Sequence, residues 1–353
     1  MKAKTKIFGI IAFINLVLFL VAYNIRPIKV NYDAKEVQLK FTVPPNFPQP
    51  ESQYDQHFVT PAGFKLGRIL FYDRALSIDN SISCASCHQS FSAFSDQNKP
   101  VSQGFKQCSG TRNTPALFNL AWQKEFMWDG RVKLFQLSSH NAIINPCEIA
   151  NSMAGAVEKL RANGHYTDLF RNAYGSVDID SARLLNALTQ FMSMLVSANS
   201  RYDKYRRYEQ GGVFTTDEKN GYILFRQKCS ACHKEPLFTD LSYRNTGLDL
   251  VSIDRGRDSS THLATDVGKF RVPSLRNIEV TAPYMHDGRF ATLEDVLTHY
   301  ANGVKRNTHL DEQLRHNGTL GLALSSSDQH KIIAFLKTLT DKEFLTDVRF
   351  QIP

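Results

Sequence analysis

The chain has 353 residues, of which 42% are hydrophobic, enough for one large core or two of ordinary size. Its 42 basic and 34 acidic residues leave a formal charge of +8 that is scattered along the chain. Because the sequence has no basic block of the kind that follows a phosphate backbone, nucleic acid is not an expected partner. A basic face that docks an acidic redox partner and an ordinary solvated surface both remain open.

The N-terminus has the layout of an export signal. Three lysines within the first six residues precede an uncharged run from Ile7 to Tyr23, and a proline-rich stretch follows. We predict that residues 1–26 are a signal peptide or an uncleaved inner-membrane anchor, and that residues 27–55 are a linker. The anchor is slightly favoured because no convincing cleavage site follows the run. Since the basic flank leaves the rest of the chain outside the cytoplasm, the expected compartment is the periplasm.

The sequence contains two copies of a C-x-x-C-H motif, at Cys84-Ala85-Ser86-Cys87-His88 and at Cys229-Ser230-Ala231-Cys232-His233. This spacing is the attachment signature of c-type haem: the two thiols bond to the porphyrin and the histidine binds its iron. A zinc site built from both cysteine pairs would leave the two histidines unexplained. A thioredoxin-like redox pair needs a βαβ context that the sequence does not show. The motifs therefore predict two covalently attached haem c groups.

The surroundings of the two motifs repeat. Each motif follows a helical run that ends in Ile-Leu-Phe and precedes an aromatic-Ser/Thr-Asp turn. These segments are Gly67–Phe71 with Phe94–Asp96, and Gly221–Phe225 with Phe238–Asp240. The duplication predicts two cytochrome-c-like helical domains with one haem each, an N-terminal domain at residues 56–205 and a C-terminal domain at residues 206–353.

The remaining pattern is helical, so the expected fold class is mainly α. Apolar residues recur at helical spacing between Asp180 and Ser200. Capping boxes at Thr215–Glu218 and Ser326–Gln329 each precede an apolar-periodic run. Two prolines, Pro273 and Pro283, interrupt any long helix in the region between these runs.

Several longer segments around the motifs are also informative. In chain order they are LFYDRALSIDNSISCASCH (ending at His88), RNTPALFN (Arg112–Asn119), MWDGR (Met127–Arg131), FTDLSYRNTGL (Phe238–Leu248), GKFRVPSLRNIEVTAPYMHDGRFATLEDV (Gly268–Val296) and AFLKTLTD (Ala334–Asp341). In this order around two haem motifs, the chain resembles the bacterial dihaem cytochrome c peroxidase and MauG family from about Phe64 to Phe350.

The resemblance implies a division of labour between the haems. Peroxide reacts at the N-terminal haem, here ligated by His88, and the C-terminal haem, here ligated by His233, passes electrons to it. Trp128 and Glu148 reproduce the spacing of a family tryptophan and glutamate. Trp128 is then an electron relay between the haems, where it could otherwise be a core aromatic residue. Glu148 is the acid/base over the open face of the first haem, since heterolysis of peroxide needs a proton moved between its oxygens.

The sequence departs from the family pattern on this far side of the first haem. Ser138 and Ala142 stand where the family usually has glutamine and proline, and Ile149 replaces a methionine. His140, between them, is a candidate distal ligand or proton shuttle, or else a polar loop histidine.

The far ligand of the second haem is the most informative position. The peroxidases have a methionine there, whereas this chain has Tyr300, as MauG does. An oxygen ligand favours the ferric and higher oxidation states. Met285 and His299 are nearby substitutes, and Tyr300 could also be an unligated residue at a helix end.

The resemblance also implies a structural cation, and the two remaining cysteines need an explanation. Asn113, Thr281 and Pro283 match positions that supply oxygens to a calcium ion between the domains. Cys108 and Cys147 flank the distal region in the chain, and an oxidising compartment favours their pairing. A disulfide and two free buried thiols both remain open.

The favoured function is a dihaem peroxidase that reduces hydrogen peroxide with electrons from a small redox protein, a cytochrome c or a cupredoxin. The first alternative is a MauG-like oxidase that uses peroxide to oxidise residues on a protein partner, and Tyr300 favours it. A non-catalytic electron carrier or haem sensor is the alternative from another class. Glu148 argues against it, because a carrier needs no acid/base beside an open iron.

Overall fold

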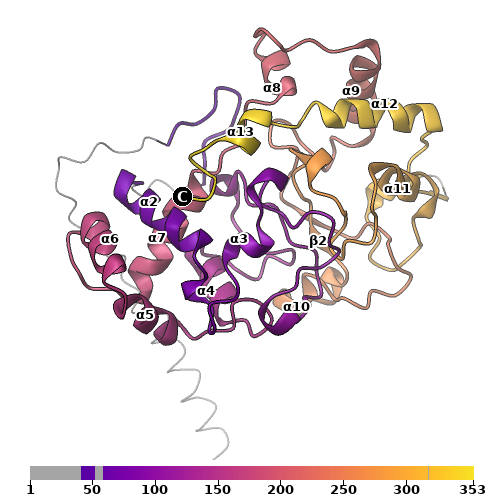
Figure 1. Ribbon diagram of the computed structural model, residues 1–353. Coiled ribbons are helices and arrows are strands. Elements are labelled where there is room, and N and C mark those ends of the chain that lie inside the picture. The colour runs from indigo at the N-terminus through magenta and orange to yellow at the C-terminus, as the bar shows by residue number, and fades with distance from the viewer. Residues whose placement is uncertain (1–40, 52–58, 317) are drawn as a thin grey trace, which may run out of the picture. The chain divides into compact units, whose positions relative to one another are not determined.

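The structure, a computed structural model, describes residues 41–51, 59–316 and 318–353. Figure 1 shows helices joined by long connections, with two short strand pairs. The helices are α2 (Pro61–Tyr72), α3 (Cys84–Cys87), α4 (Gln136–Ile144), α5 (Met153–Arg161), α6 (Gly164–Tyr174), α7 (Ser181–Ser193), α8 (Arg201–Arg206), α9 (Thr216–Lys228), α10 (Asp258–Thr261), α11 (Leu293–Thr298), α12 (Ser326–Lys337) and α13 (Lys342–Thr346). The antiparallel strand pairs are β1 (Tyr243–Arg244) with β2 (Phe270–Arg271), and β3 (Arg315–His316) with β4 (Thr319–Leu320). The prediction of a mainly α fold is confirmed.

The first half of the described chain is built on the packing of α2 against α7. Asp180 caps the N-terminus of α7 by accepting from Arg183 N, and the apolar side of α7 is buried. A Cβ added at Gly67 of α2 would lie 1.9 Å from Ala187 O, so only glycine allows this helix pair to approach so closely. The predicted helix between Asp180 and Ser200 is therefore present, although it ends at Ser193.

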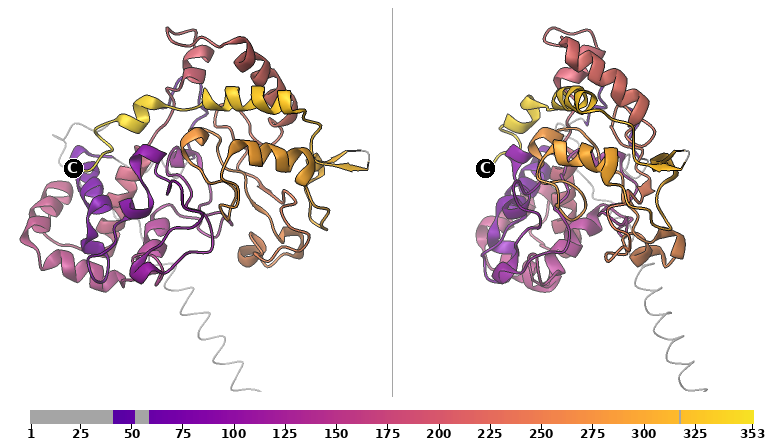
Figure 2. Two further views of the ribbon diagram at one scale, coloured as in Figure 1. Left: turned by 45° about the vertical axis from the view of Figure 1, so that its right-hand side comes forward. Right: turned by 90° about the vertical axis from the view of Figure 1, so that its right-hand side faces the viewer.

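The second half repeats this arrangement with α9 and α12, which lie side by side in Figure 1 and in both views of Figure 2. A Cβ added at Gly221 of α9 would lie 1.9 Å from Lys331 O, the same close approach as at Gly67. The predicted capping box of Thr215 and Glu218 is confirmed. The prediction for α12 was wrong by one residue: its box consists of Ser325 and Asp328, because the helix begins at Ser326 itself.

Equivalent aromatic triads fill the cores of the two halves. The ring centroids of Phe71 and Phe191 are 5.1 Å apart in the first half, and those of Phe225 and Phe335 are 5.1 Å apart in the second. The third members are Phe94 and Phe238, at 5.8 Å from Phe71 and 5.5 Å from Phe225 respectively. All six side chains are almost completely buried. Each contributes roughly 1.5–3 kcal/mol by leaving water.

A second repeated feature is a tight loop in each half. Its sequence is Met-Trp-Asp-Gly-Arg at 127–131 and Met-His-Asp-Gly-Arg at 285–289. In both loops the methionine and the glycine have positive φ angles, and an antiparallel bridge closes the loop. The bridges join Phe126 to Val132 and Tyr284 to Phe290. When the two repeats are aligned by sequence, Trp128 and His286 therefore occupy equivalent positions.

The two halves of the described chain belong to one compact unit. The end of the chain returns to the first half, where Tyr72 Oη of α2 donates to Phe350 O at 2.6 Å (Figure 1). Part of the predicted linker is also packed: Trp122 Nε1 donates to Pro48 O at 2.8 Å, and the Phe47 ring meets the Trp122 ring edge-on at 5.0 Å.

The predicted signal or anchor segment, residues 1–26, lies outside the described residues. Within the described part of the chain, every helix is too short or too polar to traverse a bilayer.

Candidate active site

The first attachment motif forms α3 and places His88 directly after it. Ser83 and Ser86 cap the helix reciprocally. His88 Nδ1 lies 2.7 Å from Phe94 O. Because a carbonyl oxygen can only accept, Nδ1 must carry the proton, which leaves the Nε2 lone pair for a metal. Burial lowers the pKa of His88, which also favours the neutral ligand form.

The second attachment motif follows the end of α9 and has the same arrangement. His233 Nδ1 lies 3.1 Å from Phe238 O, so the Nε2 lone pair of this histidine is also left for a metal. Burial raises the pKa of the Cys84 and Cys229 thiols to about 12 in each case, as expected for cysteines inside an apolar site. The described residues contain no group of three or more His, Cys, Asp or Glu side chains arranged to hold a metal ion.

The core aromatic triads determine where these carbonyl groups point. Phe94 and Phe238 both have positive φ angles, 62° and 56°. Such a backbone is unfavourable for a bulky residue by about 1–3 kcal/mol, and burial of the ring offsets this cost. In each half, the packing of one phenylalanine therefore orients the histidine of the attachment motif.

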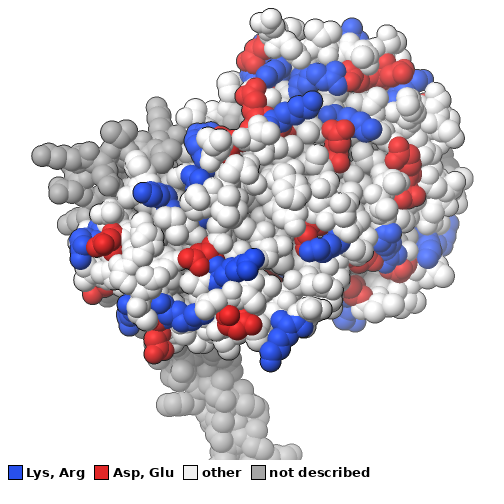
Figure 3. All heavy atoms as spheres, viewed as in Figure 1, with Lys and Arg blue, Asp and Glu red and all other residues white. Residues whose placement is uncertain are grey.

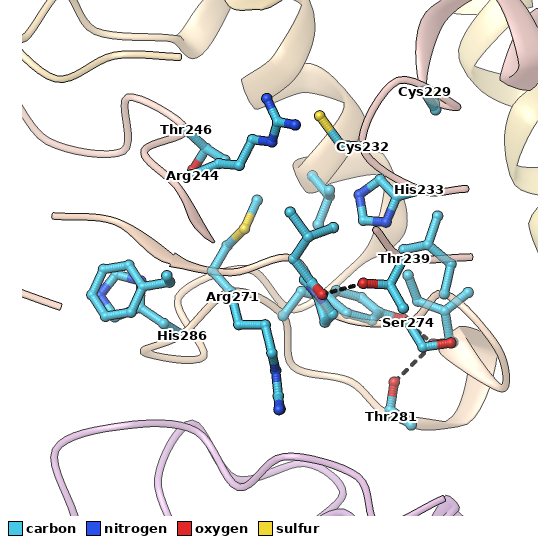
Figure 4. A pocket seen from close by; sticks show the side chains of 18 of the residues that line it. Cys229, Cys232, His233, Thr239, Arg244, Thr246, Arg271, Ser274, Thr281 and His286 are labelled. Atoms are coloured by element: carbon cyan, nitrogen blue, oxygen red, sulfur yellow. Dashed lines mark hydrogen bonds between the residues drawn. The ribbon is translucent and has the colours of Figure 1, made fainter. Parts of the chain in front are cut away.

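A cavity of about 280 Å³ lies beside the second motif (Figure 4). Cys229, Cys232 and His233 line it, and so do Met285 and Tyr300. Most of its wall is apolar. Phe238 O engages Nδ1 of His233, and the Pro273 backbone also hydrogen-bonds this ring. An apolar slot with two attachment thiols and an available imidazole nitrogen fits a covalently bound haem.

Tyr300 belongs to a π-helical turn, His299–Gly303, that continues α11. Burial raises the pKa of its phenol well above the usual range, and the nearby Cys232 and Cys229 thiols raise it further. The phenol therefore lies within electrostatic range of the haem-attachment cysteines. His299 Nε2 is already 3.0 Å from Thr246 O, which leaves Tyr300 and Met285 as the better placed candidates for a far ligand.

Glu148 lies on the loop that follows α4, near the first attachment motif. Asn145 Nδ2 donates to Glu148 Oε1 at 2.7 Å. Burial raises the pKa of this carboxyl, and the Asn145 hydrogen bond and the charge of Arg131 oppose the rise. The pKa values of the Cys84 and Cys87 thiols are raised mainly by burial. The negative charge of Glu148 raises both values further. Protein surrounds the carboxyl group, yet the side chain is still accessible to solvent. Both properties suit an acid/base that an external substrate must reach.

His140 and Ser138 lie on α4, before the Glu148 loop. His140 Nδ1 is 3.4 Å from Asn141 Oδ1, at the long limit of a hydrogen bond. The Ser138 hydroxyl is buried without a hydrogen-bond partner among the described residues. The alternative of a loop histidine was wrong, because His140 lies within α4. Its role as a distal ligand or proton shuttle remains a prediction.

Trp128 of the first half lies beside the second site. It belongs to the Met-Trp-Asp-Gly-Arg loop of the first half, yet it lines the cavity of the second. Its Nε1 donates to Asn113 O at 2.8 Å, and its carbonyl oxygen accepts from Arg271 N of β2 at 2.8 Å. The position is that expected of a relay, and this role remains a prediction.

The predicted calcium residues come together at the same cavity. Asn113, Thr281 and Pro283 all line it. The Asn113 Nδ2 donates to Lys99 O and Pro100 O, so this side chain binds the main chain through its nitrogen. The proximity agrees with the predicted group of ligands, and calcium itself remains a prediction.

Two features of the site were left open or missed by the sequence reasoning. Cys108 and Cys147 form a disulfide, which resolves the choice between pairing and free thiols. Arg271, a half-buried cation whose N–H donates to Trp128 O, was missed, although it lies within the matched segment Gly268–Val296. Its NH1 donates to Glu125 O at 2.8 Å, across the boundary of the two halves.

Comparison with known proteins agrees with this architecture. The family model for di-haem cytochrome c peroxidase matches residues 61–211. The methylamine utilization protein MauG of Methylorubrum extorquens is 34% identical over 311 residues, which cover 87% of this chain and 85% of the relative. The cytochrome c551 peroxidase of Nitrosomonas europaea is 32% identical over 281 residues, 78% of this chain and 79% of the relative. A solved MauG-like protein associated with microbial copper homeostasis superposes with a TM-score of 0.79 at 30% identity and covers 89% of this chain and 99% of that one.

Fold and sites define a helical protein with two c-type haem sites, one in each half. The chain belongs to the di-haem cytochrome c peroxidase and MauG family. It is accordingly an oxidoreductase of the peroxidase type that acts on peroxide and carries two c-type haems.

Proposed function

We propose that hydrogen peroxide reacts at the haem of the first motif and that electrons reach it through the haem of the second. The observation that carries this assignment is the contrast between the two far sides. The first has an accessible carboxyl group, Glu148, with a raised pKa, whereas the second has a half-buried phenol, Tyr300, that lines a cavity. A bound haem supplies the iron at which peroxide is reduced.

Glu148 moves the proton that peroxide cleavage requires. Its carboxylate would accept a proton from one oxygen of hydrogen peroxide and return it to the other, while a bound haem would supply the two electrons that cleavage of the O–O bond consumes. Asn145 holds Oε1 of Glu148 by a 2.7 Å hydrogen bond, so the carboxyl group is oriented before peroxide arrives. His140 is the second candidate for this proton transfer, from α4.

Trp128 carries electrons between the two haems. Its indole lines the cavity of the second haem while its main chain belongs to the first half. The hydrogen bonds to Asn113 O and from Arg271 N fix both its ring and its backbone. A calcium ion held by Asn113, Thr281 and Pro283 would further fix the geometry between the haems.

A MauG-like oxidation of a protein partner is the second candidate function. The position of Tyr300 in the second cavity favours it, because an oxygen ligand stabilises ferric and higher states of that haem. The MauG relative of M. extorquens is also the more similar of the two curated relatives described above.

One titration separates the two candidates. The purified diferric protein is mixed anaerobically with hydrogen peroxide, with and without prior one-electron reduction, and followed by optical and Mössbauer spectra. A peroxidase of the proposed kind reacts only after the second haem is reduced. A direct reaction of the diferric form would instead support the MauG-like function.

The setting of the reaction is also a proposal. Residues 56–205 and 206–353 act as the two haem domains, placed in the periplasm by the N-terminal segment, which is cleaved or remains as an inner-membrane anchor. In the peroxidase function the electron donor is a cytochrome c or a cupredoxin. In the MauG-like function a protein substrate supplies the electrons instead. On the face shown in Figure 3, Lys and Arg are interspersed with Asp and Glu, so this face gives no reason to prefer a donor of one charge.

A further inference from the structure

The loop Ser102–Gly110 closes on itself. Gly110 N donates to Ser102 O at 3.1 Å, and Gly104 N donates to Cys108 O at 2.9 Å. An isolated antiparallel bridge joins Gln103 to Ser109 between them. We call this closed segment the clasp loop. Its internal bonds keep the positions of its two sides fixed relative to each other.

One side of the clasp loop is attached to the first haem motif. Ser102 Oγ donates to Asp96 Oδ2 at 2.8 Å. The same serine also hydrogen-bonds the Cys87 side chain. This bond lowers the pKa of the thiol, although burial raises it by more. Asp96 ends the turn in which Phe94 O holds His88. This side of the loop is therefore fixed to the residues that attach and ligate the haem.

The other side is attached to the residue before Glu148 and to Glu148 itself. Cys108 forms a disulfide with Cys147. Phe105 N donates to Glu148 O at 3.0 Å. A Cβ added at Gly104 would lie 2.1 Å from Cys147 O and 2.8 Å from Glu148 Cα, so only glycine permits the two backbones to approach so closely.

We infer that the clasp loop is a positioning device that holds Glu148 at a fixed place relative to the first haem. The inference rests on the proposed function, in which Glu148 transfers the proton. Such transfer needs heavy atoms within about 2.6–3.2 Å of each other. A displacement of about 1 Å can lower a rate by about 10²-fold, so a backbone held at three points, by the disulfide, the Phe105 amide and the Gly104 contact, preserves the reaction geometry.

The test removes the disulfide from the full-length chain that carries both haems, after one-electron reduction of the second haem. Cys108→Ser/Cys147→Ser changes both cysteines, so that no lone thiol is left beside the haem. We expect the rate constant for reaction with hydrogen peroxide, measured by stopped flow, to fall by about tenfold. Mass spectrometry should show that both haems are still attached.

A double-mutant cycle separates positioning from general stabilisation. The same serine pair in a Glu148→Gln background should cause no further slowing, because the group to be positioned is no longer functional. If the disulfide only stabilises the fold, the pair slows the reaction equally in both backgrounds, which overturns the inference.

The pH profile gives a second readout. Asn145 and Arg131 face the Glu148 carboxyl, while the neighbouring Cys84 and Cys87 become uncharged thioethers once haem is attached. Release of the loop reduces the burial that raises the pKa of the Glu148 carboxyl, so the inflection of the rate constant should move to lower pH in the serine pair. An unchanged inflection contradicts positioning.

Two glycine variants supply a matched comparison that keeps the disulfide. Gly104→Ala should slow the reaction, because its methyl group pushes against Cys147 O. Gly110→Ala, in the same loop, has its nearest neighbours at 3.8 and 3.9 Å and should react like the wild type. If Glu148→Gln alone leaves the rate unaltered, the proposed function fails. If Glu148→Gln slows the reaction and the serine pair and Gly104→Ala do not, the inference fails alone.

Discussion

The two halves of the chain hold their histidines in the same way and differ on the opposite side of each site. Phe94 O and Phe238 O accept from His88 and His233 at 2.7 and 3.1 Å. Beyond this shared frame, the first half presents the accessible Glu148 and the second presents Tyr300 inside a cavity. A duplicated scaffold could thus hold two chemically different haems, because the repeated part fixes only the histidine of each motif.

The repeated loops show a similar divergence. Trp128 and His286 occupy equivalent places, but their surroundings differ. Trp128 Nε1 is bonded to Asn113 O, whereas the His286 ring stacks on Phe270 at a centroid distance of 3.7 Å. His286 O in turn accepts from Asn113 N at 2.7 Å. Asn113 therefore links the two equivalent loops across the junction of the halves, which is where a relay has to lie.

The largest expected effect is the loss of haem attachment in one half while the other half keeps its haem. Cys229→Ser/Cys232→Ser should abolish covalent attachment at the second site only, because each motif has its own pair of attachment cysteines. Intact mass should fall from two haem groups above the polypeptide to one. The corresponding change of Cys84 and Cys87 is the control for the first half, and a protein that carries a single haem before any substitution would contradict the two-site architecture.

The next effect concerns a buried ion pair between Arg276 and Asp203 in the second half. In the first half, Phe118 stands at the position that aligns with Arg276, since both follow a Pro-x-Leu segment and precede an asparagine. Arg276 is buried and donates to both carboxylate oxygens of Asp203 at 2.8 Å. Arg276→Met leaves the Asp203 charge without its partner and should lower the free energy of unfolding by about 3–5 kcal/mol. Denaturant unfolding of the holoprotein measures this loss. Arg226→Met, a substitution of an exposed arginine on α9, is the control and should change stability by less than about 0.5 kcal/mol.

A third prediction tests the chemistry assigned to the first half. Glu148→Gln should leave both haems attached and slow the reaction with peroxide by at least about tenfold, the lower end of acid/base contributions. Stopped-flow mixing at pH 7 measures the rate constant. His140→Ala is the comparison, and a loss confined to His140→Ala would transfer the acid/base role to that residue.

The pH dependence of the wild type belongs to the same test. Burial raises the Glu148 pKa above the usual value of about 4.3, and the proton is accepted by the ionised form. The rate constant should therefore be full above the raised pKa and should fall as the pH drops through it. Glu148→Gln should remove this inflection, since its amide does not titrate.

The smallest effect changes only the character of the second haem. Tyr300→Met should raise its reduction potential, because a thioether stabilises the ferrous state. Potentiometric titration measures the shift, and near-infrared spectra should gain the weak band of Met–Fe ligation. Tyr300→Phe is the control: if its potential and spectrum equal those of the wild type, Met285 or another group ligates the iron and the MauG-like alternative loses its main support.

Several properties followed from the sequence alone because they depend on local spacing. The two C-x-x-C-H motifs, the mainly helical fold and the capping box at Thr215–Glu218 involve residues close together in the chain, and the structure agrees with each. The α12 cap was misplaced by one residue because three consecutive serines, Ser325–Ser327, all offer a capping hydroxyl. The family resemblance added Trp128, Glu148 and Tyr300, whose roles local patterns would not have revealed.

Only the tertiary structure decided how distant residues combine. Whether Cys108 and Cys147 pair depends on the approach of two loops, which Gly104 permits and no spacing rule states. The carbonyl groups that orient both histidines depend on positive φ angles at Phe94 and Phe238. Burial of their rings in the aromatic triads offsets that strain, and burial is a property of the packed chain, which the order of its residues does not display.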